Sequence, residues 1–148
     1  MAESIRTVRP SPSTMLVELV AIDWLKPHEK IRPKKVAELQ KMTLRWNAYT
    51  KPLLVDRRSG SILDGHHRYT VGINLELLRL PAILVDYLQD DSIELDLWPA
   101  SKLTKISKRQ VIDMSNSNEL FPAKTTRHRF GDTLPPIAVS LADLGYSD

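Results

Sequence analysis

The sequence contains no cysteine, and this absence excludes several kinds of chemistry at once. Disulfide bonds, thiolate zinc sites, iron–sulfur clusters and cysteine nucleophiles are all ruled out. Of the 148 residues, 42% are hydrophobic and 26% are charged. This length and composition are typical of one globular domain, which is what we expect here.

The sequence also lacks long hydrophobic runs. No apolar stretch reaches the roughly 18 residues that span a bilayer, and the first ten residues have no hydrophobic centre of the kind that a signal peptide needs. We therefore expect a cytoplasmic protein with no membrane partner. The formal net charge is +3, which favours an anionic ligand. The basic runs of a nucleic-acid-binding tail are missing, so charge alone does not choose a partner and gives no reason to expect nucleic acid.

Hydrophobic periodicity predicts alternating strands and helices along the chain. Strands are expected over residues 15–22, 52–56, 61–63, 80–88 and 92–98. One helix is expected from Pro33 to about Asn47, a second after Gly65, and a third after the capping box formed by Ser107 and Gln110. This order predicts an α+β fold with a small mixed β-sheet flanked by helices.

The two ends of the chain differ in character from its middle. Residues 1–13, rich in Ser and Pro, are expected to form a flexible tail. A single domain is expected over residues 14–131, and residues 132–148 are expected to be a C-terminal extension of that same domain. No internal repeat or low-complexity segment divides the chain further.

The strongest local signal is the run DGHHR at residues 64–68, which follows an apolar strand. A helix that begins here presents unpaired N–H groups and a partial positive charge, and Gly65 lets an anion approach the backbone. Asp64 could hold Mg²⁺ together with phosphate oxygens. On spacing alone, a turn and helix cap with surface histidines explains the run equally well. A Zn²⁺ or Mn²⁺ site is a third interpretation, disfavoured because His66 and His67 point apart on a helix.

Three other positions carry polar or aromatic groups that could serve a site. Pro27 places Glu29 on a loop, where it is the best candidate for a general base outside the DGHHR run, although a solvated surface glutamate is the commoner case. Residues 122–129 gather cations and hydroxyls that suit a carboxylate or phosphate, or else form a solvated basic loop. Trp98 either lines a pocket or closes the core.

Taken together, these segments resemble the free L-serine kinases of the ParB/sulfiredoxin superfamily. The resemblance is carried, in order, by LKPHEKI at 25–31, LDGHHR at 63–68, LPAILVDY at 80–87, LWPASKLTK at 97–105 and PAKTTRH at 122–128. Five segments in one order are more specific than any single motif. Sulfiredoxins carry a cysteine at the position of His66, so sulfinic acid reduction is excluded. ParB proteins carry a Gly-Glu-Arg-Arg type of signature, which differs from the run found here.

The resemblance implies a ParB/sulfiredoxin-like domain that phosphorylates free L-serine to O-phospho-L-serine, using ADP or ATP and Mg²⁺. It implies that Glu29 and Asp64 are catalytic and that Asp64 also assists the Mg²⁺. The residues implied to hold the nucleotide are Asp64, Gly65, His66, His67 and Arg68. Those implied to bind serine or the transferred phosphoryl group are Trp98, Lys124, Thr125, Thr126, Arg127 and His128.

A second hypothesis keeps this fold but not the reaction. A non-catalytic nucleotide-binding regulatory module, or a DNA-binding ParB-like module, would bind nucleotide without forming a product. A metal-dependent nuclease is a third hypothesis. The sequence does not decide between ADP and ATP as the donor, and it sets no oligomeric state.

Overall fold

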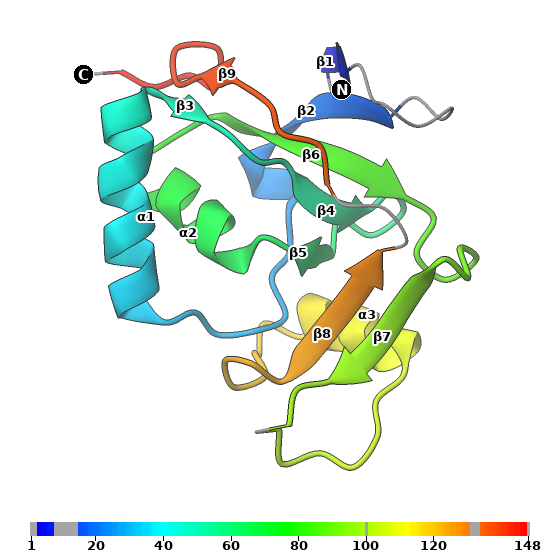
Figure 1. The fold of residues 1–148 in the computed structure, drawn as a ribbon. Coiled ribbons are helices and arrows are strands. Elements are labelled where there is room, and N and C mark those ends of the chain that lie inside the picture. Colours follow the sequence, from blue (N-terminus) through cyan, green and yellow to red (C-terminus); the bar gives the residue numbers. More distant parts are fainter. Residues whose placement is uncertain (1–2, 8–14, 100, 131–133, 148) are drawn as a thin grey trace.

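The centre of the fold is a five-stranded mixed sheet (Figure 1). The computed structural model describes residues 3–7, 15–99, 101–130 and 134–147. The strands follow the order β1 (Glu3–Thr7), β2 (Met15–Ala21), β6 (Arg79–Val85), β4 (Leu53–Asp56) and β5 (Ile62–Asp64). β4 and β6 run parallel and the other neighbours run antiparallel. The predicted α+β fold with a small mixed sheet is confirmed.

Helices cover this sheet on both faces, and strand β4 explains why. Its side chains alternate between two hydrophobic clusters, as strand geometry requires. Leu53 and Val55 belong to the cluster that includes α1 (Pro33–Trp46) and α2 (His66–Asn74), whereas Leu54 belongs to the cluster that includes α3 (Lys108–Asn116). All four residues of β4 are therefore buried. The sequence of a strand that is buried on both faces is typically a continuous apolar run.

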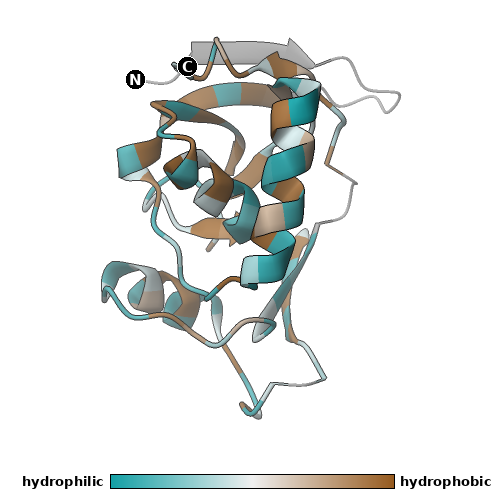
Figure 2. Ribbon diagram, turned by 90° about the vertical axis from the view of Figure 1, so that its left-hand side faces the viewer, coloured by the Kyte–Doolittle hydropathy of each residue, from teal (hydrophilic) through white to brown (hydrophobic). Residues whose placement is uncertain are grey.

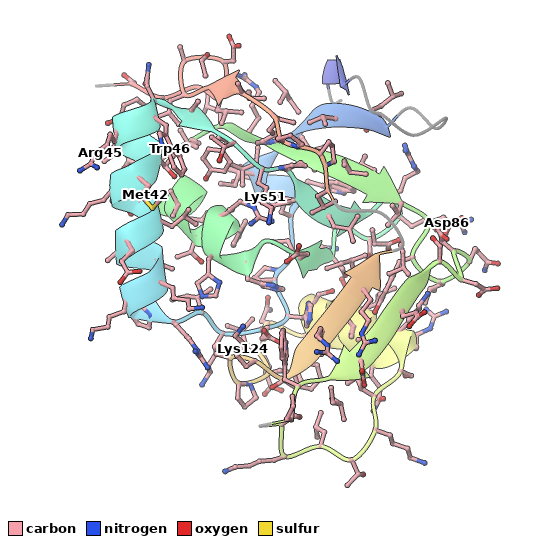
Figure 3. All side chains as sticks on the ribbon, viewed as in Figure 1. Met42, Arg45, Trp46, Lys51, Asp86 and Lys124 are labelled. Atoms are coloured by element: carbon pink, nitrogen blue, oxygen red, sulfur yellow. The ribbon has the colours of Figure 1, made fainter. Side chains whose placement is uncertain are left out.

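The three helices begin where the sequence predicts, and α1 also ends where expected. Helix α1 starts with Pro33 and ends at Asn47 in the left-handed conformation, at φ 54°. Helix α3 has the predicted capping box, in which Ser107 and Gln110 exchange hydrogen bonds. Figure 2 shows hydrophilic and hydrophobic residues alternating along α1, as expected of a helix with one buried stripe. Trp46, the last residue of α1, is 45% exposed (Figure 3).

A two-stranded ribbon of β7 (Ile93–Leu97) and β8 (Thr126–Phe130) lies beside α3 (Figure 1). The basic loop that was one interpretation of residues 122–129 is not found from Thr126 onward, where the chain forms β8. Thr126 pairs with Leu97 and Arg129 with Glu94, so the backbone of this polar segment is satisfied by β7. A partner strand some thirty residues away turned a segment with loop-like composition into a strand.

The C-terminal segment completes the cluster beneath α1 and α2. Strand β9 (Val139–Ser140) pairs with β3 (Ala48–Tyr49), and both Leu141 and Leu144 are fully buried. Both two-residue strands escape prediction because they are too short for any periodicity. The segment 1–13, predicted as a tail, contains β1, and its residues 1–2 and 8–13 lie outside the described residues. No helix of the described chain is long and apolar enough to cross a membrane.

A substitution at Leu141 tests whether the C-terminal segment packs into the core. We expect Leu141→Ala to lower the free energy of unfolding by about 2–5 kcal/mol, because it removes a fully buried side chain and leaves a cavity. Urea unfolding monitored by tryptophan fluorescence measures this loss. Leu103→Ala, at a position 41% exposed, is the matched control and should change stability by less than about 0.5 kcal/mol. Equal losses in both variants would contradict this packing.

Candidate active site

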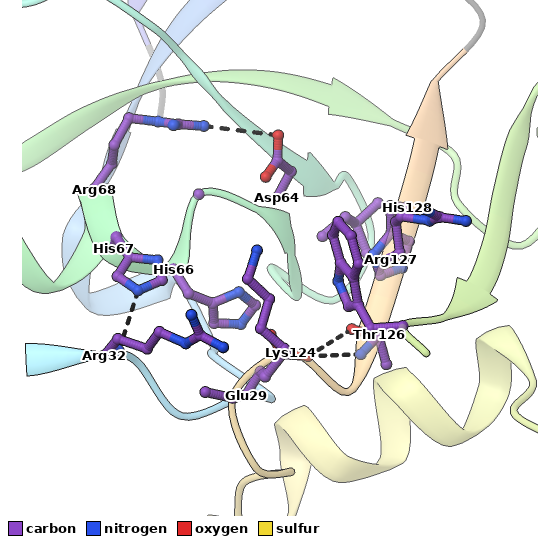
Figure 4. Close-up of a pocket in the computed structure, with 14 residues that line it drawn as sticks. Glu29, Arg32, Asp64, His66, His67, Arg68, Lys124, Thr126, Arg127 and His128 are labelled. Carbon is purple, nitrogen blue, oxygen red and sulfur yellow. Dashed lines mark hydrogen bonds and ion pairs between the residues drawn. The ribbon is translucent and has the colours of Figure 1, made fainter. Parts of the chain in front are cut away.

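A pocket of about 200 Å³ lies where β5, the start of α2, the loop before α1 and the segment leading into β8 converge (Figure 4). It is lined by Glu29, Arg32, Leu63, Asp64, Gly65, His66, His67, Arg68, Trp98, Ala123, Lys124, Thr126, Arg127 and His128. Every site residue expected from the sequence is in this lining except Thr125. Lysine and arginine side chains outnumber the carboxylates, so the pocket suits an anionic ligand.

Gly65 forms the turn between β5 and α2, and only glycine suits it. Its φ is 113°, a conformation that L side chains rarely adopt. A Cβ atom here would lie 2.7 Å from Cγ of Leu53 and 3.1 Å from Nη2 of Arg68. Among the described residues, no side chain caps the N-terminus of α2. The first N–H groups of the helix are therefore not used by a side-chain cap, and residues 65–68 line the pocket, which is the usual setting for a bound phosphate.

Asp64 and Arg68 form an ion pair beside this turn. Nη2 of Arg68 lies 3.8 Å from Oδ2 of Asp64 (Figure 4). The same nitrogen donates a hydrogen bond to the carbonyl of Pro52 at 3.1 Å. The Asp64 side chain is 55% exposed and lines the pocket. One carboxylate beside a phosphate site fits Mg²⁺, which usually takes one or two carboxylates and completes its shell with phosphate and water oxygens.

His66 and His67 hold the loop before α1 against α2. Nε2 of His66 accepts the backbone N–H of His28 at 3.1 Å, and Nε2 of His67 accepts the backbone N–H of Arg32 at 3.1 Å. The rings point apart, as the helix geometry predicts. Both Nε2 atoms are occupied by backbone N–H groups and are therefore not free to bind one shared Zn²⁺ or Mn²⁺ ion. Both rings are accepting at Nε2, so the N–H of each is at Nδ1.

Glu29 is the most firmly held carboxylate of the pocket. Its Oε1 accepts hydrogen bonds from the backbone N–H of Thr126 at 2.8 Å, from the Thr126 hydroxyl at 3.0 Å and from the backbone N–H of Thr125 at 3.2 Å. The flanking backbone is fixed as well, because Lys30 donates to the carbonyl of Phe121 and Phe121 donates to the carbonyl of His28. The predicted loop glutamate is thus not a mobile surface group.

Two cations lie over the ring of Trp98. Nζ of Lys124 is 4.3 Å from the ring centroid and the guanidinium of Arg127 is 4.8 Å from it. Arg127 is also paired with Asp96 at 3.2 Å. Figure 4 shows Lys124 reaching across the pocket from its loop. Thr125 differs from its neighbours, because its buried hydroxyl donates to the carbonyl of Pro122 at 2.6 Å and lies outside the pocket lining.

Three histidines cluster beneath the pocket. The ring of His28 lies edge-on to His66 at 4.6 Å and to His128 at 5.8 Å, and His128 also contacts the Tyr87 hydroxyl at 2.8 Å. Burial lowers the pKa of His28 to about 4, partly offset by the nearby Ile62 carbonyl. Burial, with the other histidines, lowers the pKa of His66 well below its usual range, and burial lowers the pKa of His128 to about 3. All three rings are neutral at pH 7.

This cluster makes the protein sensitive to acid. Unfolded histidines take up protons near pH 6.5, whereas the pKa of folded His28 is about 4 and that of folded His128 about 3. The unfolded state binds more protons as the pH falls, so the stability present above pH 6.5 is lost below it. Relative to pH 7.5, we expect each of these two histidines to lower the free energy of unfolding at pH 5 by about 2 kcal/mol. Urea midpoints that agree at pH 7.5 and pH 5 would contradict this.

Arg32 is a pocket residue that the sequence reasoning missed. It is the residue before α1, and Figure 4 shows its side chain in the pocket close to Glu29 and His66. The available signal was its position three residues after Glu29 on the same loop, immediately before Pro33. A cation that follows the candidate base on a loop held by two histidines is a natural neighbour of a bound anion.

Comparison with known proteins adds sequence relatives but no family model, since none matches the chain. A "ParB-like protein" of Sulfolobus acidocaldarius is 36% identical over 58% of this chain and 42% of its own length. An "ATP-dependent L-serine kinase" of Staphylothermus marinus is 30% identical over 61% of this chain and 37% of its own length. An "ADP-dependent L-serine kinase" of Thermococcus kodakarensis is 30% identical over 56% of this chain and 36% of its own length. The matches thus span less than half of these relatives.

A solved structure described as "Free serine kinase in complex with AMP" superimposes with a TM-score of 0.77 at 16% identity, covering 86% of this chain and 93% of that one. The chain has the free serine kinase fold. The resemblance to L-serine kinases and to ParB-like proteins that was seen in the sequence is confirmed by these relatives. Within the free serine kinase fold, the DGHHR turn, the Glu29 loop and β8 are the three segments that meet at the pocket.

Proposed function

We propose that this protein transfers a phosphoryl group from ADP or ATP to the hydroxyl of free L-serine, with Mg²⁺ as cofactor. The observation that carries the proposal is that one pocket combines a fixed carboxylate, Glu29, with an uncapped helix N-terminus at Gly65. The first can accept a proton and the second can bind phosphate. Relatives named as ATP-dependent and ADP-dependent L-serine kinases support this proposal.

The phosphates of the donor would bind at the start of α2. The N–H groups after Gly65 and the guanidinium of Arg68 are the donors suited to them. Since the Nε2 atoms of His66 and His67 already accept backbone N–H groups, these rings serve the nucleotide mainly by holding the pocket wall. Mg²⁺ bound by Asp64 and phosphate oxygens would neutralise charge on the transferring group.

Serine would lie between Glu29 and the terminal phosphate. Its carboxylate suits the cations of Lys124 and Arg127, which stack on Trp98. The serine oxygen attacks the terminal phosphorus, the bond from that phosphorus to the leaving nucleotide breaks, and Glu29 accepts the hydroxyl proton. Phosphoryl transfer depends mostly on positioning and on electrostatic stabilisation, which the cations and the helix N-terminus would supply.

Both nucleotides are candidate donors because the pocket residues named here recognise phosphate, and the named relatives include one kinase of each type. Since ADP and ATP are cytoplasmic metabolites, we also propose the cytoplasm as the place of action. A non-catalytic nucleotide-binding module is the second candidate, because one relative is named as a ParB-like protein and not as a kinase.

An acceptor screen separates these candidates. The protein is incubated with Mg²⁺, one nucleotide, and serine, threonine or homoserine, and the amino acids are analysed by mass spectrometry. A mass gain of one phosphoryl group on serine, larger than on the other two, supports the kinase. Nucleotide binding by calorimetry with no phosphorylated amino acid supports the non-catalytic module. If only threonine or only homoserine is phosphorylated, that amino acid, and not serine, is the acceptor.

A further inference from the structure

We propose that His28 and Thr126 are positioning residues that hold one oxygen of Glu29 and thereby assign the proton transfer to the other. This inference rests on the proposed serine kinase function. His28 is fully buried, and its Nε2 lies 2.9 Å from Oγ1 of Thr126, which in turn lies 3.0 Å from Oε1 of Glu29. These three side chains form a continuous hydrogen-bonded chain from the interior to the pocket.

The donor in each of these hydrogen bonds follows from counting protons. A carboxylate only accepts, so the Thr126 hydroxyl donates its single proton to Glu29. The hydroxyl oxygen must then accept from His28, which therefore carries its proton on Nε2. Nδ1 of His28 is buried with the Ile62 carbonyl near the ring, but it makes no hydrogen bond among the described residues, so the proton count at Thr126 decides where the His28 proton lies.

His28 is itself fixed from several sides. Its backbone N–H donates to Nε2 of His66, its carbonyl accepts the N–H of Phe121, and its ring is edge-on to the rings of His66 and His128. The hydrogen-bonded chain therefore ties the Glu29 loop to both α2 and β8. The orientation of the Thr126 hydroxyl is therefore fixed by these rigid neighbours and not by solvent.

The two carboxylate oxygens of Glu29 are held differently. Oε1 receives three hydrogen bonds, two from backbone N–H groups and one from Thr126, whereas no hydrogen bond from the described residues reaches Oε2. Oε2 is therefore the oxygen available for the serine proton. Loss of the Thr126 hydroxyl would let the carboxylate rotate, and a misplacement of about 1 Å at a reacting group can cost about 10²-fold in rate.

The kinetic test compares three threonine variants. We expect Thr126→Val, which keeps the shape and removes the hydroxyl, to lower kcat by about 10–100-fold with the KM for nucleotide unchanged. Thr126→Ser should restore kcat to within about threefold. Thr43→Val removes another buried hydroxyl, one that bonds the carbonyl of Leu39 in α1, and should leave kcat unchanged. Wild-type kcat in Thr126→Val, or a Thr126→Ser variant as slow as Thr126→Val, would overturn the proposal.

A second readout does not depend on activity. ¹⁵N NMR of histidine-labelled protein distinguishes protonated from unprotonated ring nitrogens. We expect His28 to carry its proton on Nε2, and the His28→Gln variant identifies its signals. A proton on Nδ1, directed at the Ile62 carbonyl, would reverse the hydrogen bond to Thr126 and overturn the chain. If wild-type protein makes no phosphoserine while the Nε2–H form is found, the proposed function fails and the hydrogen-bonded chain stands.

Discussion

Glu29→Gln is expected to lower kcat by about 10²–10⁴-fold, the range that one general base contributes. The amide oxygen of glutamine can still accept the N–H groups of Thr125 and Thr126, so the loop should keep its place. What is lost is an oxygen that takes the serine proton. Nucleotide affinity should change little, because the phosphates are assigned to the start of α2, and calorimetry measures this separately from turnover.

The matched control for this variant is Glu38→Gln on the exposed side of α1. It removes the same charge from the protein and should leave kcat at the wild-type value. A Glu29→Gln enzyme with wild-type turnover would show that the carboxylate is not the base. Equal loss of turnover and of nucleotide affinity would show instead that Glu29 helps to shape the nucleotide site.

Arg68→Ala is expected to weaken nucleotide binding by about 10–100-fold, which corresponds to the roughly 1.5–3 kcal/mol of a hydrogen bond to a charged group. Arg68 is placed at the start of α2 by a bond to the carbonyl of Pro52, beside Asp64. The expected loss should be larger for ADP and ATP than for adenosine, because the guanidinium recognises phosphate. Titration calorimetry with the three ligands measures this difference.

Arg58→Ala supplies the control. Arg58 is an exposed arginine that pairs with Asp86 outside the pocket. Replacing it with alanine lowers the net charge of the protein by the same amount as Arg68→Ala. We expect its nucleotide affinity to match the wild type. A thermal melt of Arg68→Ala verifies that the variant is folded, and Arg68→Lys serves if it is not. Unchanged nucleotide affinity in a folded Arg68 variant would remove this residue from the phosphate site.

Local features of the fold were predictable because their causes are local. Pro33 and Asn47 bound α1, Ser107 and Gln110 cap α3, and Gly65 marks the turn into α2. Each signal lies within a few residues of the structure that it determines. The strand β8 was missed because its hydrogen bonds come from β7, about thirty residues earlier in the chain. Its sequence, rich in charge, has no local reason to be extended.

The site shows the same division. The residue types of the DGHHR run and of the Glu29 loop are enough to indicate phosphate and proton chemistry. Their contacts do not follow from the sequence. The bonds from His66 to the backbone of His28, and from Thr126 to Glu29, join residues 38 and 97 positions apart. Such contacts arise only when the sheet brings α2, β8 and the loop before α1 to one place.

The most direct measurement of the central claim is ³¹P NMR of the purified protein with Mg²⁺ and L-serine, run in parallel with ADP and with ATP. We predict an O-phosphoserine resonance that requires serine and appears with at least one nucleotide, together with a matching loss of the donor's terminal phosphate signal. Glu29→Gln should give no such resonance over the same time. Unchanged nucleotide spectra with both donors, in a protein shown to bind them, would contradict the kinase assignment.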